Sequence, residues 1–364
     1  MTTAWLDRAG PQIPPADGPA MAAASAHLDQ LTKPPGSLGG LETIAIRLAG
    51  IRGRLVTDIE RPAVIVFAAD HGVAARGVSA YPSEVTAQMV ANFAAGGAAI
   101  NVLARAAGAG LVVVDIGVAG GNAAAVRTEL PGSSSGARLI HARIASGTQD
   151  FASGPAMTRD QALAAIETGR VVAADLIEDG ADLLAIGEMG IGNTTSASAI
   201  VAALTGEPVR AVTGRGTGVD DPGLDRKVAV IDAALALHQL DPEDPIGVLA
   251  AVGGFEIAGL VGAILAAATA RVPAVVDGFI TGAAALVASG LAPNLPDRLL
   301  AAHRSLEPGH AIVLDRLGLR PILELDLRLG EGSGAALAIP IIRAAARICG
   351  EMATFEQAGV SGSG

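Results

Sequence analysis

A run of glycines followed by hydroxyl and amide side chains lies near the middle of the chain, from Gly187 to Ser196. Glycine lets a ligand approach the backbone closely, and Asn193, Thr194 and Thr195 are residue types that begin helices. Free N–H groups at a helix start, together with hydroxyl groups, can hold a phosphate. The stretch therefore predicts an anion site, with a purely structural turn as the alternative.

A second glycine-rich turn runs from Thr213 to Gly218. Arg215 in this turn and Lys227 further along could contact the same anion. The alternative for Lys227 is an ordinary surface residue on a helix. Asp220 and Asp221, which precede Pro222, are expected to cap that helix.

A lone carboxylate stands between glycines in Gly330-Glu331-Gly332, just before an apolar stretch that is typical of a helix. A tight loop can push such a carboxylate into a cavity, where burial raises its pKa towards that of a useful base. A helix-capping loop has the same sequence features, and the spacing alone does not separate the two interpretations.

Other kinds of chemistry lack their sequence patterns. No pair of histidines has a helical metal-ligand spacing with a nearby carboxylate, so we expect no metal. A serine-centred nucleophile elbow is also absent. The single cysteine, Cys349, excludes an internal disulfide and is expected to be a small buried side chain. His71, directly after an apolar run, is a candidate polar site residue.

The candidate residues follow short apolar runs that are rich in valine and isoleucine. Continuous apolarity is typical of strands buried on both faces, and helix-compatible segments separate the runs. The pattern predicts a doubly wound α/β sheet with ligands at the carboxyl ends of its strands. The expected strands are 63–69, 111–116, 183–186, 209–212, 273–276, 311–314 and 321–325. The expected helices are 21–31, 84–107, 158–178, 194–204, 224–240, 257–270, 282–289 and 333–349.

The two ends of the chain differ from this pattern. The start is rich in proline and then helical, and the end is a helix followed by a tail, 354–364, that we expect to be mobile. We therefore expect an N-terminal arm and helical segment at 1–60, a large α/β catalytic domain at 61–330, and a C-terminal helix with its tail at 331–364. The first and last parts are expected to join in one small domain.

The composition limits what the chain can bind. Its 364 residues are 51% hydrophobic and only 2% aromatic, and they carry a formal net charge of −11. This charge argues against nucleic acids and anionic membrane surfaces as partners. The uninterrupted apolar run 257–270 is shorter than the roughly 18 residues of a membrane span. The chain opens with no secretion signal, so we expect a cytoplasmic protein.

Short motifs accompany these turns along almost the whole chain. They are Leu31–Gly39, Ala69–Val73 with Gly77–Ser79, Val85–Met89, Gly187–Thr195, Gly214–Gly218, Arg304–His310 and Arg328–Gly332. In this order they resemble the motifs of the nicotinate-nucleotide–dimethylbenzimidazole phosphoribosyltransferase family, which acts in cobalamin assembly. The resemblance implies transfer of phosphoribose from nicotinate mononucleotide to 5,6-dimethylbenzimidazole, giving α-ribazole 5′-phosphate and nicotinate without a cofactor.

The resemblance also implies a homodimer, a mostly parallel Rossmann-like sheet and roles for single residues. Glu331 would accept the proton, and Glu188 would stabilise the cationic ribose or act as a second base. The nucleotide would contact Gly190, Gly192, Asn193, Thr194, Gly216, Lys227, Asp277 and Ser305. The benzimidazole would contact Ser79, Tyr81, Gln88 and Met89.

This reaction needs few catalytic groups. Nicotinate on a ribose is a pyridinium, so it leaves without a proton from an acid. The attacking benzimidazole must lose a hydrogen, so one carboxylate base is the minimum requirement.

Two other functions fit parts of the sequence. The stretch Val275–Gly282 superficially resembles the loop of phosphoribosyltransferases that use a pyrophosphate-activated donor. That loop usually carries two adjacent acidic residues, and Gly278 stands where the second would be. A non-catalytic nucleotide- or benzimidazole-binding protein is the other alternative, although it would have little use for a lone carboxylate in a pocket.

Overall fold

The computed structural model describes residues 11–120, 127–128 and 137–361, in which eight strands form one sheet. The order is β3-β4-β2-β1-β5-β6-β7-β8. All neighbours pair in parallel except β3 (Arg127–Thr128), which runs antiparallel to β4 at one edge. The other strands are β1 (Pro62–Ala69), β2 (Gly110–Gly117), β4 (Arg138–His141), β5 (Leu183–Met189), β6 (Ala274–Val276), β7 (Leu299–His303) and β8 (Pro321–Leu323). The predicted doubly wound, mostly parallel sheet is confirmed.

The direction in which the sheet grows reverses between β1 and β5. From β1 the chain builds outward through β2 and β4, and it then returns to the other side of β1 with β5, β6, β7 and β8. In a doubly wound sheet, ligands bind in the crevice outside the carboxyl ends of the strands at such a reversal. His71 follows β1, and Glu188 lies near the end of β5, so two of the predicted motifs meet at this crevice.

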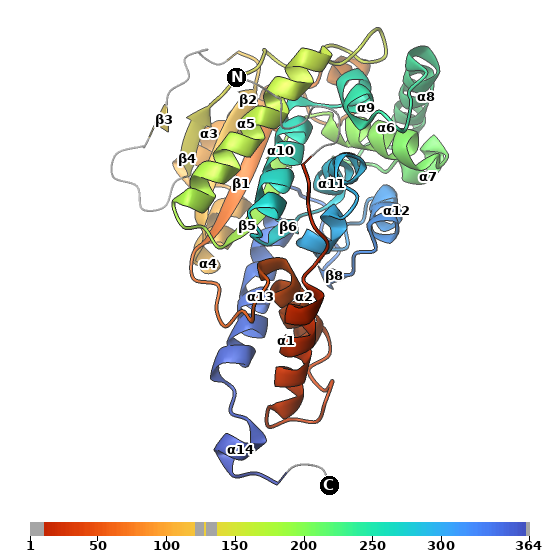
Figure 1. Cartoon of the computed structure of the whole chain (residues 1–364). Helices are drawn as coiled ribbons and strands as arrows, with labels where there is room; N and C mark the ends of the chain where they lie inside the picture. Colours follow the sequence, from red (N-terminus) through yellow and green to blue (C-terminus); the bar gives the residue numbers. More distant parts are fainter. Residues whose placement is uncertain (1–10, 121–126, 129–136, 362–364) are drawn as a thin grey trace.

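Helices cover both faces of the sheet (Figure 1). Side chains of β1 alternate between the two layers, since Ile65 and Phe67 face one core and Val64 and Val66 the other, all fully buried. This two-sided burial explains the continuous apolar runs. Helices of the first layer are α5 (Arg159–Glu178), α6 (Asn193–Thr205), α9 (Pro245–Val252), α10 (Phe255–Thr269) and α11 (Phe279–Leu291), flanked by α7 (Val209–Val212), α8 (Asp221–His238) and α12 (Pro308–Leu317). Those of the second are α2 (Gly40–Arg52), α3 (Glu84–Ala95), α4 (Ala99–Ala106) and α13 (Ser333–Glu351).

Two of the expected strands, 209–212 and 311–314, are wrong. The first forms α7, and the second lies inside α12. In both segments the buried side chains recur three to four residues apart, which is the period of a helix. They are Val209 and Val212 in α7, and His310, Val313, Leu314 and Leu317 in α12.

The expected long helix over 84–107 is divided in two. Helix α3 ends at Ala95, Gly96 adopts a φ of 82°, and α4 begins only at Ala99. Strand β7, which was not expected, consists of leucine and alanine before its final histidine. It lacks the β-branched residues that favour strands, although all five residues are buried.

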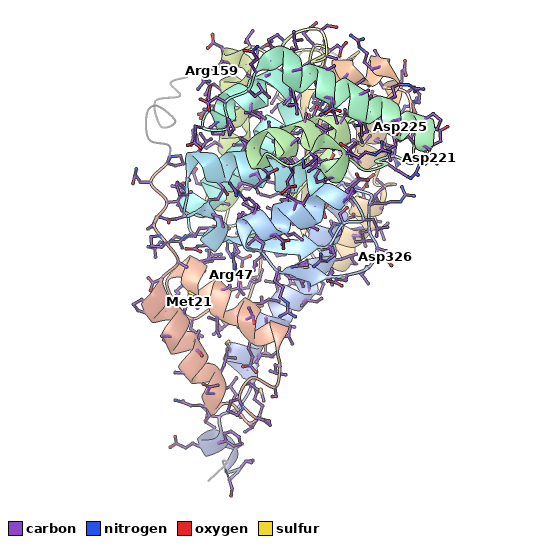
Figure 2. The ribbon with its side chains drawn as sticks, turned by 90° about the vertical axis from the view of Figure 1, so that its right-hand side faces the viewer. Met21, Arg47, Arg159, Asp221, Asp225 and Asp326 are labelled. Atoms are coloured by element: carbon purple, nitrogen blue, oxygen red, sulfur yellow. The ribbon has the colours of Figure 1, made fainter. Side chains whose placement is uncertain are left out.

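Helices α1 (Gly18–Gln30), α2 and α13 pack together below the sheet as a helical lobe (Figure 1). Gly50 of α2 leaves room for the side chain of Met21 of α1, and Nε of Arg47 donates to the carbonyl of Leu299 in β7 over 2.6 Å (Figure 2). The buried Arg298 donates to carbonyls of the N-terminal arm and of α2. Both chain ends thus meet and are tied to the sheet.

The C-terminal tail differs from the expected mobile segment over its described part. Thr354 forms a β-bridge with Leu31 and caps α14 (Phe355–Ala358) by accepting from the backbone of Gln357. Residues 362–364 lie outside the described part of the chain.

Two stretches of the described chain are long and apolar enough to cross a membrane by length and composition alone, Glu84–Ala106 and Ser333–Glu351. The first is interrupted between α3 and α4. The second is α13, and 56% of its apolar window is buried against the rest of the protein, as in a core helix. The run 257–270, considered from the sequence, lies almost entirely in the buried α10.

Candidate active site

A cavity of about 400 Å³ lies beyond the carboxyl ends of β5, β6 and β7. Three acidic side chains line it: Glu188 from the end of β5, Asp277 directly after β6, and Glu331 directly before α13. All three are buried. Sequence positions nearly 150 residues apart are therefore brought into one cluster, which is called the carboxyl cluster below.

The loop that carries Glu331 lies directly over β5. A Cβ atom on Gly187 would overlap the backbone nitrogen of Gly332, so only glycine permits this approach. The N–H of Glu331 donates to the carbonyl of Glu188 over 3.1 Å. Glu331 has a φ of 62°, a left-handed conformation that is uncommon for any residue with a side chain.

Asp277 holds the other side of this loop. Its Oδ1 accepts the N–H of Ala335 over 2.9 Å, and the N–H groups of Gly332 and Gly334 also donate to its carboxylate. Asp277 therefore caps the N-terminus of α13 from a distant strand. The loop that presents Glu331 is thus fixed at both ends by groups of the same cavity.

The carboxyl cluster holds protons more tightly than free side chains do. Burial, together with the charges of Glu256 and Asp277, raises the pKa of Glu188 to about 8. Burial raises the pKa of Asp277 to about 7, although three backbone N–H groups act against it. Burial also raises the pKa of Glu331, opposed by a backbone hydrogen bond from Ile100. The cluster can therefore accept or supply protons near neutral pH.

The predicted anion site lies at the start of α6. Gly190, Asn193 and Thr194 line the cavity, and Nδ2 of Asn193 donates to Oε2 of Glu188. Gly192 caps the helix with a φ of 98° and faces His71 rather than the cavity. The N–H groups of Asn193 and Thr195 donate within the turn, to the carbonyls of Gly190 and Gly192. The positive end of the α6 dipole lies beside the carboxyl cluster, where it favours an anion.

Lys227 is fully buried, so the alternative of a surface residue is wrong. Its Nζ donates to Oγ1 of Thr194 over 2.8 Å and to the carbonyl of Gly214 over 3.2 Å. A Cβ on Gly216 would lie within 3.2 Å of this ammonium group, so the turn and the lysine are adjacent. Burial lowers the pKa of Lys227 to about 8, opposed by the charge of Glu307. A negative ligand beside it would favour the charged form.

Arg215 does not join Lys227, contrary to the sequence expectation. Its guanidinium pairs with Asp221, and both side chains are more than half exposed. Figure 2 shows Asp221 at the outer end of α8, at the edge of the molecule. Of the two predicted caps, Asp220 caps α8, since its Oδ1 accepts the N–H of Gly223, whereas Asp221 pairs with Arg215.

The segment before α12 closes the opposite wall. Ser305 and Glu307 line the cavity, and Oε1 of Glu307 accepts the N–H of Gly216 over 2.9 Å. Burial lowers the pKa of His303 to about 4 and, with the charges of His303 and Arg304, that of His310 to about 3. Both rings are therefore neutral at pH 7. Sequence reasoning did not single out Glu307; its signal was a carboxylate directly before Pro308-Gly309 at a helix start.

The residues expected to bind a benzimidazole separate into two groups. Tyr81 and Met89 line the cavity, and Tyr81 is 55% exposed at its mouth. Ser79 and Gln88 are not among the residues that line it. Oγ of Ser79 instead lies 3.1 Å from Oγ1 of Thr217, and Gln88 is exposed on α3.

Within the described residues, no group of three or more His, Cys, Asp or Glu side chains could hold a metal ion. Cys349 is buried in α13 and is not among the residues that line the cavity, as expected of a structural side chain.

Comparison with known proteins shows the family. A family model described as phosphoribosyltransferase matches residues 13–360. The chain belongs to this phosphoribosyltransferase family. A relative from Chloroflexus aggregans, named nicotinate-nucleotide–dimethylbenzimidazole phosphoribosyltransferase, is 58% identical over 96% of both chains. One of the same name from Geobacter sulfurreducens is 54% identical over 98% of both.

Solved structures agree with the family. The crystal structure of CobT from Thermus thermophilus has a TM-score of 0.87 and 51% identity, covering 95% of this chain and 100% of that one. The resemblance read from the motifs is therefore confirmed, and the family model extends over both the sheet and the helical lobe.

Proposed function

We propose that this phosphoribosyltransferase transfers phosphoribose from nicotinate mononucleotide to 5,6-dimethylbenzimidazole, giving α-ribazole 5′-phosphate and nicotinate for the lower ligand of cobalamin. The names of relatives more than 50% identical over nearly the whole chain support this reaction. The observation that carries it is the carboxyl cluster beside the start of α6, because the reaction needs a base and an anion site in one cavity.

Glu331 acts as the base in this proposal. One nitrogen of the benzimidazole attacks C1′ of the ribose while the other loses its hydrogen to the Glu331 carboxylate. Burial brings the pKa of this carboxyl closer to neutral, where a general base is most effective. Asp277 keeps the base in place through its hydrogen bonds to the following backbone.

The donor lies with its phosphate at the start of α6. Asn193, Thr194 and Gly216 contact the phosphate, with Lys227 directly behind them and Ser305 on the facing wall. Glu188 then lies beside the ribose, where the positive charge of the bound donor favours its ionised form. The carboxylate stabilises the positive charge that develops as nicotinate leaves. Attack from the opposite face converts the β donor into an α product. Holding both substrates in line provides much of the remaining rate enhancement.

The acceptor enters past Tyr81 and Met89, whose side chains form an apolar wall of the cavity. Ser79 and Gln88 belong to the acceptor side in this proposal, and they lie on the segment that leads into the same wall. An apolar wall discriminates weakly between close analogues, so other benzimidazoles are accepted to different degrees.

Product analysis tests the proposed reaction. The protein is incubated with nicotinate mononucleotide and a panel of bases, and the products are identified by mass spectrometry. We expect α-ribazole 5′-phosphate with dimethylbenzimidazole, and undiminished formation in EDTA because no metal takes part. Loss of activity in EDTA, or product only from a pyrophosphate-activated donor, would favour the other class of phosphoribosyltransferase. Binding of both ligands without product would favour a binding protein.

We further propose that the protein is a cytoplasmic homodimer with two domains. A small domain comprises 1–60 and 331–364, and the large domain comprises 61–330. The packing of α1, α2 and α13 supports the small domain.

Three exposed leucines support the proposed homodimer. Leu306, Leu325 and Leu329 are each more than half exposed, and Leu329 is at the cavity. Exposed leucines near a functional site favour a subunit interface, and sedimentation velocity would measure the mass in solution.

A further inference from the structure

A buried ion pair lies directly behind the Gly190–Asn193 loop, outside the cavity. Nε2 of His71 lies 2.5 Å from Oε1 of Glu256, and neither side chain is exposed. The proposed reaction gives no task to either residue. His71 is a candidate site residue from the sequence, but it is not among the residues that line the cavity.

The hydrogen bonds of His71 show how the pair is arranged. Oγ of Ser196 donates to the carbonyl of Gly253 over 3.3 Å, so it accepts from Nδ1–H of His71 over 3.0 Å. Nε2 then shares a second hydrogen with Glu256. Oε2 of Glu256 is buried with no hydrogen-bond partner among the described residues, so His71 is the group that compensates this carboxylate.

The pair supports the loop from behind. A Cβ on Gly190 would come within 3.2 Å of Oε1 of Glu256 and 3.3 Å of Cδ2 of His71. The other side of the loop faces the cavity, because Gly190 and Asn193 line it. A displaced pair would therefore displace the loop that brings Asn193 to Glu188.

Glu256 also acts on Glu188 through its charge. The charged groups that face Glu188 are Glu256 on α10, Asp277 after β6 and Glu331 before α13, and Asn193 on α6 donates to it. After burial, Glu256 is the strongest of the causes that raise the pKa of Glu188. Glu256 is the member of this set that does not line the cavity.

We propose that His71 and Glu256 are positioning residues for the reaction proposed above, on which this inference rests. Their pair holds the Gly190–Asn193 loop against the cavity, and the carboxylate of Glu256 sets the charge state of Glu188. Neither residue contacts substrate.

The proton on Glu188 can be followed without any turnover. A neutral buried carboxylic acid has its own infrared carbonyl band, which is assigned to Glu188 by its loss in Glu188→Gln. The midpoint at which this band titrates is compared in the wild type and in Glu256→Gln. We expect the midpoint to fall by about one pH unit or more, because a nearby like charge has been removed.

Two further variants separate charge from structure. His71→Gln leaves Glu256 in place with an amide as its hydrogen-bond partner, so it should lower the midpoint by less than Glu256→Gln does. It should lower kcat because the loop loses its support. The double variant with glutamine at both positions keeps a hydrogen bond without charges, and it should lower the midpoint as Glu256→Gln does. If a single variant does not fold, the midpoint is compared between the double variant and the wild type.

The matched control is Glu42→Gln, which breaks the buried Lys33–Glu42 pair of the helical lobe and should leave the midpoint unchanged. An unchanged midpoint in Glu256→Gln, or an equal fall in His71→Gln, would overturn the proposal. Full turnover in Glu188→Gln would instead remove Glu188 from the proposed reaction, while the infrared midpoints would still decide the role of the pair.

Discussion

Glu331 is a residue in an uncommon backbone conformation held by its neighbours. Its positive φ costs free energy of the order of 1 kcal/mol or more, and such costs persist only where surrounding structure enforces them. Here the enforcing contacts are the hydrogen bond to Glu188 and the cap that Asp277 places on α13. A capping loop alone would not need a side chain at this position, so the strain supports a functional role for the carboxylate.

Glu331→Gln should keep donor binding and lose turnover. The amide fills the same space but cannot accept the proton, so we expect kcat to fall by about 10²- to 10⁴-fold. In the wild type, kcat/KM for the acceptor should rise with pH as Glu331 ionises, and this rise should disappear in the variant. Glu324→Gln, an exposed change on the same connection, serves as the control. Unchanged turnover in Glu331→Gln would remove Glu331 from the mechanism.

Lys227→Met should weaken the donor and spare the acceptor. A buried positive charge behind the phosphate, with its hydrogen bond to Thr194, contributes about 1.4 kcal/mol or more, so the donor Kd should rise about 10-fold or more. In the wild type the donor should also bind more weakly as pH rises through about 8, where the free enzyme's Lys227 loses its proton. Calorimetry with each ligand separately measures both effects. Arg226→Met removes a charge from the exposed side of the same helix as a control, and equal losses for donor and acceptor would contradict the assignment.

At the scale of elements, the sequence predicts those strands and helices whose own residues show how they are buried. Strands such as 63–69 were found because both of their faces are covered. The sequence does not predict β7 because leucine and alanine do not distinguish a strand from a helix. The apolar runs of α7 and α12 are short enough to fit strands as well as helices. Only the packing of distant elements decides these cases.

The candidate site shows the same division. Glycine-rich turns after strands located Glu188 and the start of α6 from local signals. The approach of Gly187 to the Glu331 loop joins residues far apart in the chain, and so does the pair of His71 with Glu256. Neither contact produces a local sequence pattern, so the sequence does not predict which distant residues surround the site.

The contact between β5 and the Glu331 loop predicts the effect of Gly187→Ala. The added methyl group overlaps the backbone nitrogen of Gly332, so the loop must move. We expect a stability loss of about 1–3 kcal/mol and a fall in kcat of about 100-fold, the size expected when a catalytic group is displaced by about 1 Å. Thermal unfolding and steady-state kinetics measure the two effects.

Gly154→Ala is the control for this change, because nothing lies within 4 Å of its added Cβ. It should leave both stability and kcat close to those of the wild type. Wild-type turnover in Gly187→Ala would show that the position of the Glu331 loop does not limit the reaction.

At the scale of the whole molecule, the cavity concentrates buried ionisable groups whose effects on stability have opposite signs. Glu188 and Asp277 bind protons more tightly in the folded protein than unfolded, with folded pKa values of about 8 and 7 against 4.5 and 3.8. They stabilise the fold fully at low pH, and this contribution is lost as pH rises to the folded values. His303 and His310 have folded pKa values of about 4 and 3 against 6.5 unfolded, so their contribution to stability is lost as pH falls below 6.5. The folded pKa of Lys227 is about 8 against 10.5 unfolded, so its contribution to stability grows as pH rises above about 8.

Between pH 6.5 and 8, the pH dependence of stability therefore comes from the two carboxyl groups. Above pH 7 it comes mainly from Glu188. We expect the free energy of unfolding of the ligand-free protein to fall as pH rises through this window, by at most about 1.4 kcal/mol per pH unit for each proton released. Chemical denaturation at constant ionic strength measures the slope. In Glu188→Gln the slope between pH 7 and 8 should flatten, because the amide has no proton to lose. A slope that is the same in both proteins would mean that Glu188 is already ionised in the folded state, and the proton that the cavity holds near neutral pH would then have to be sought on another member of the carboxyl cluster.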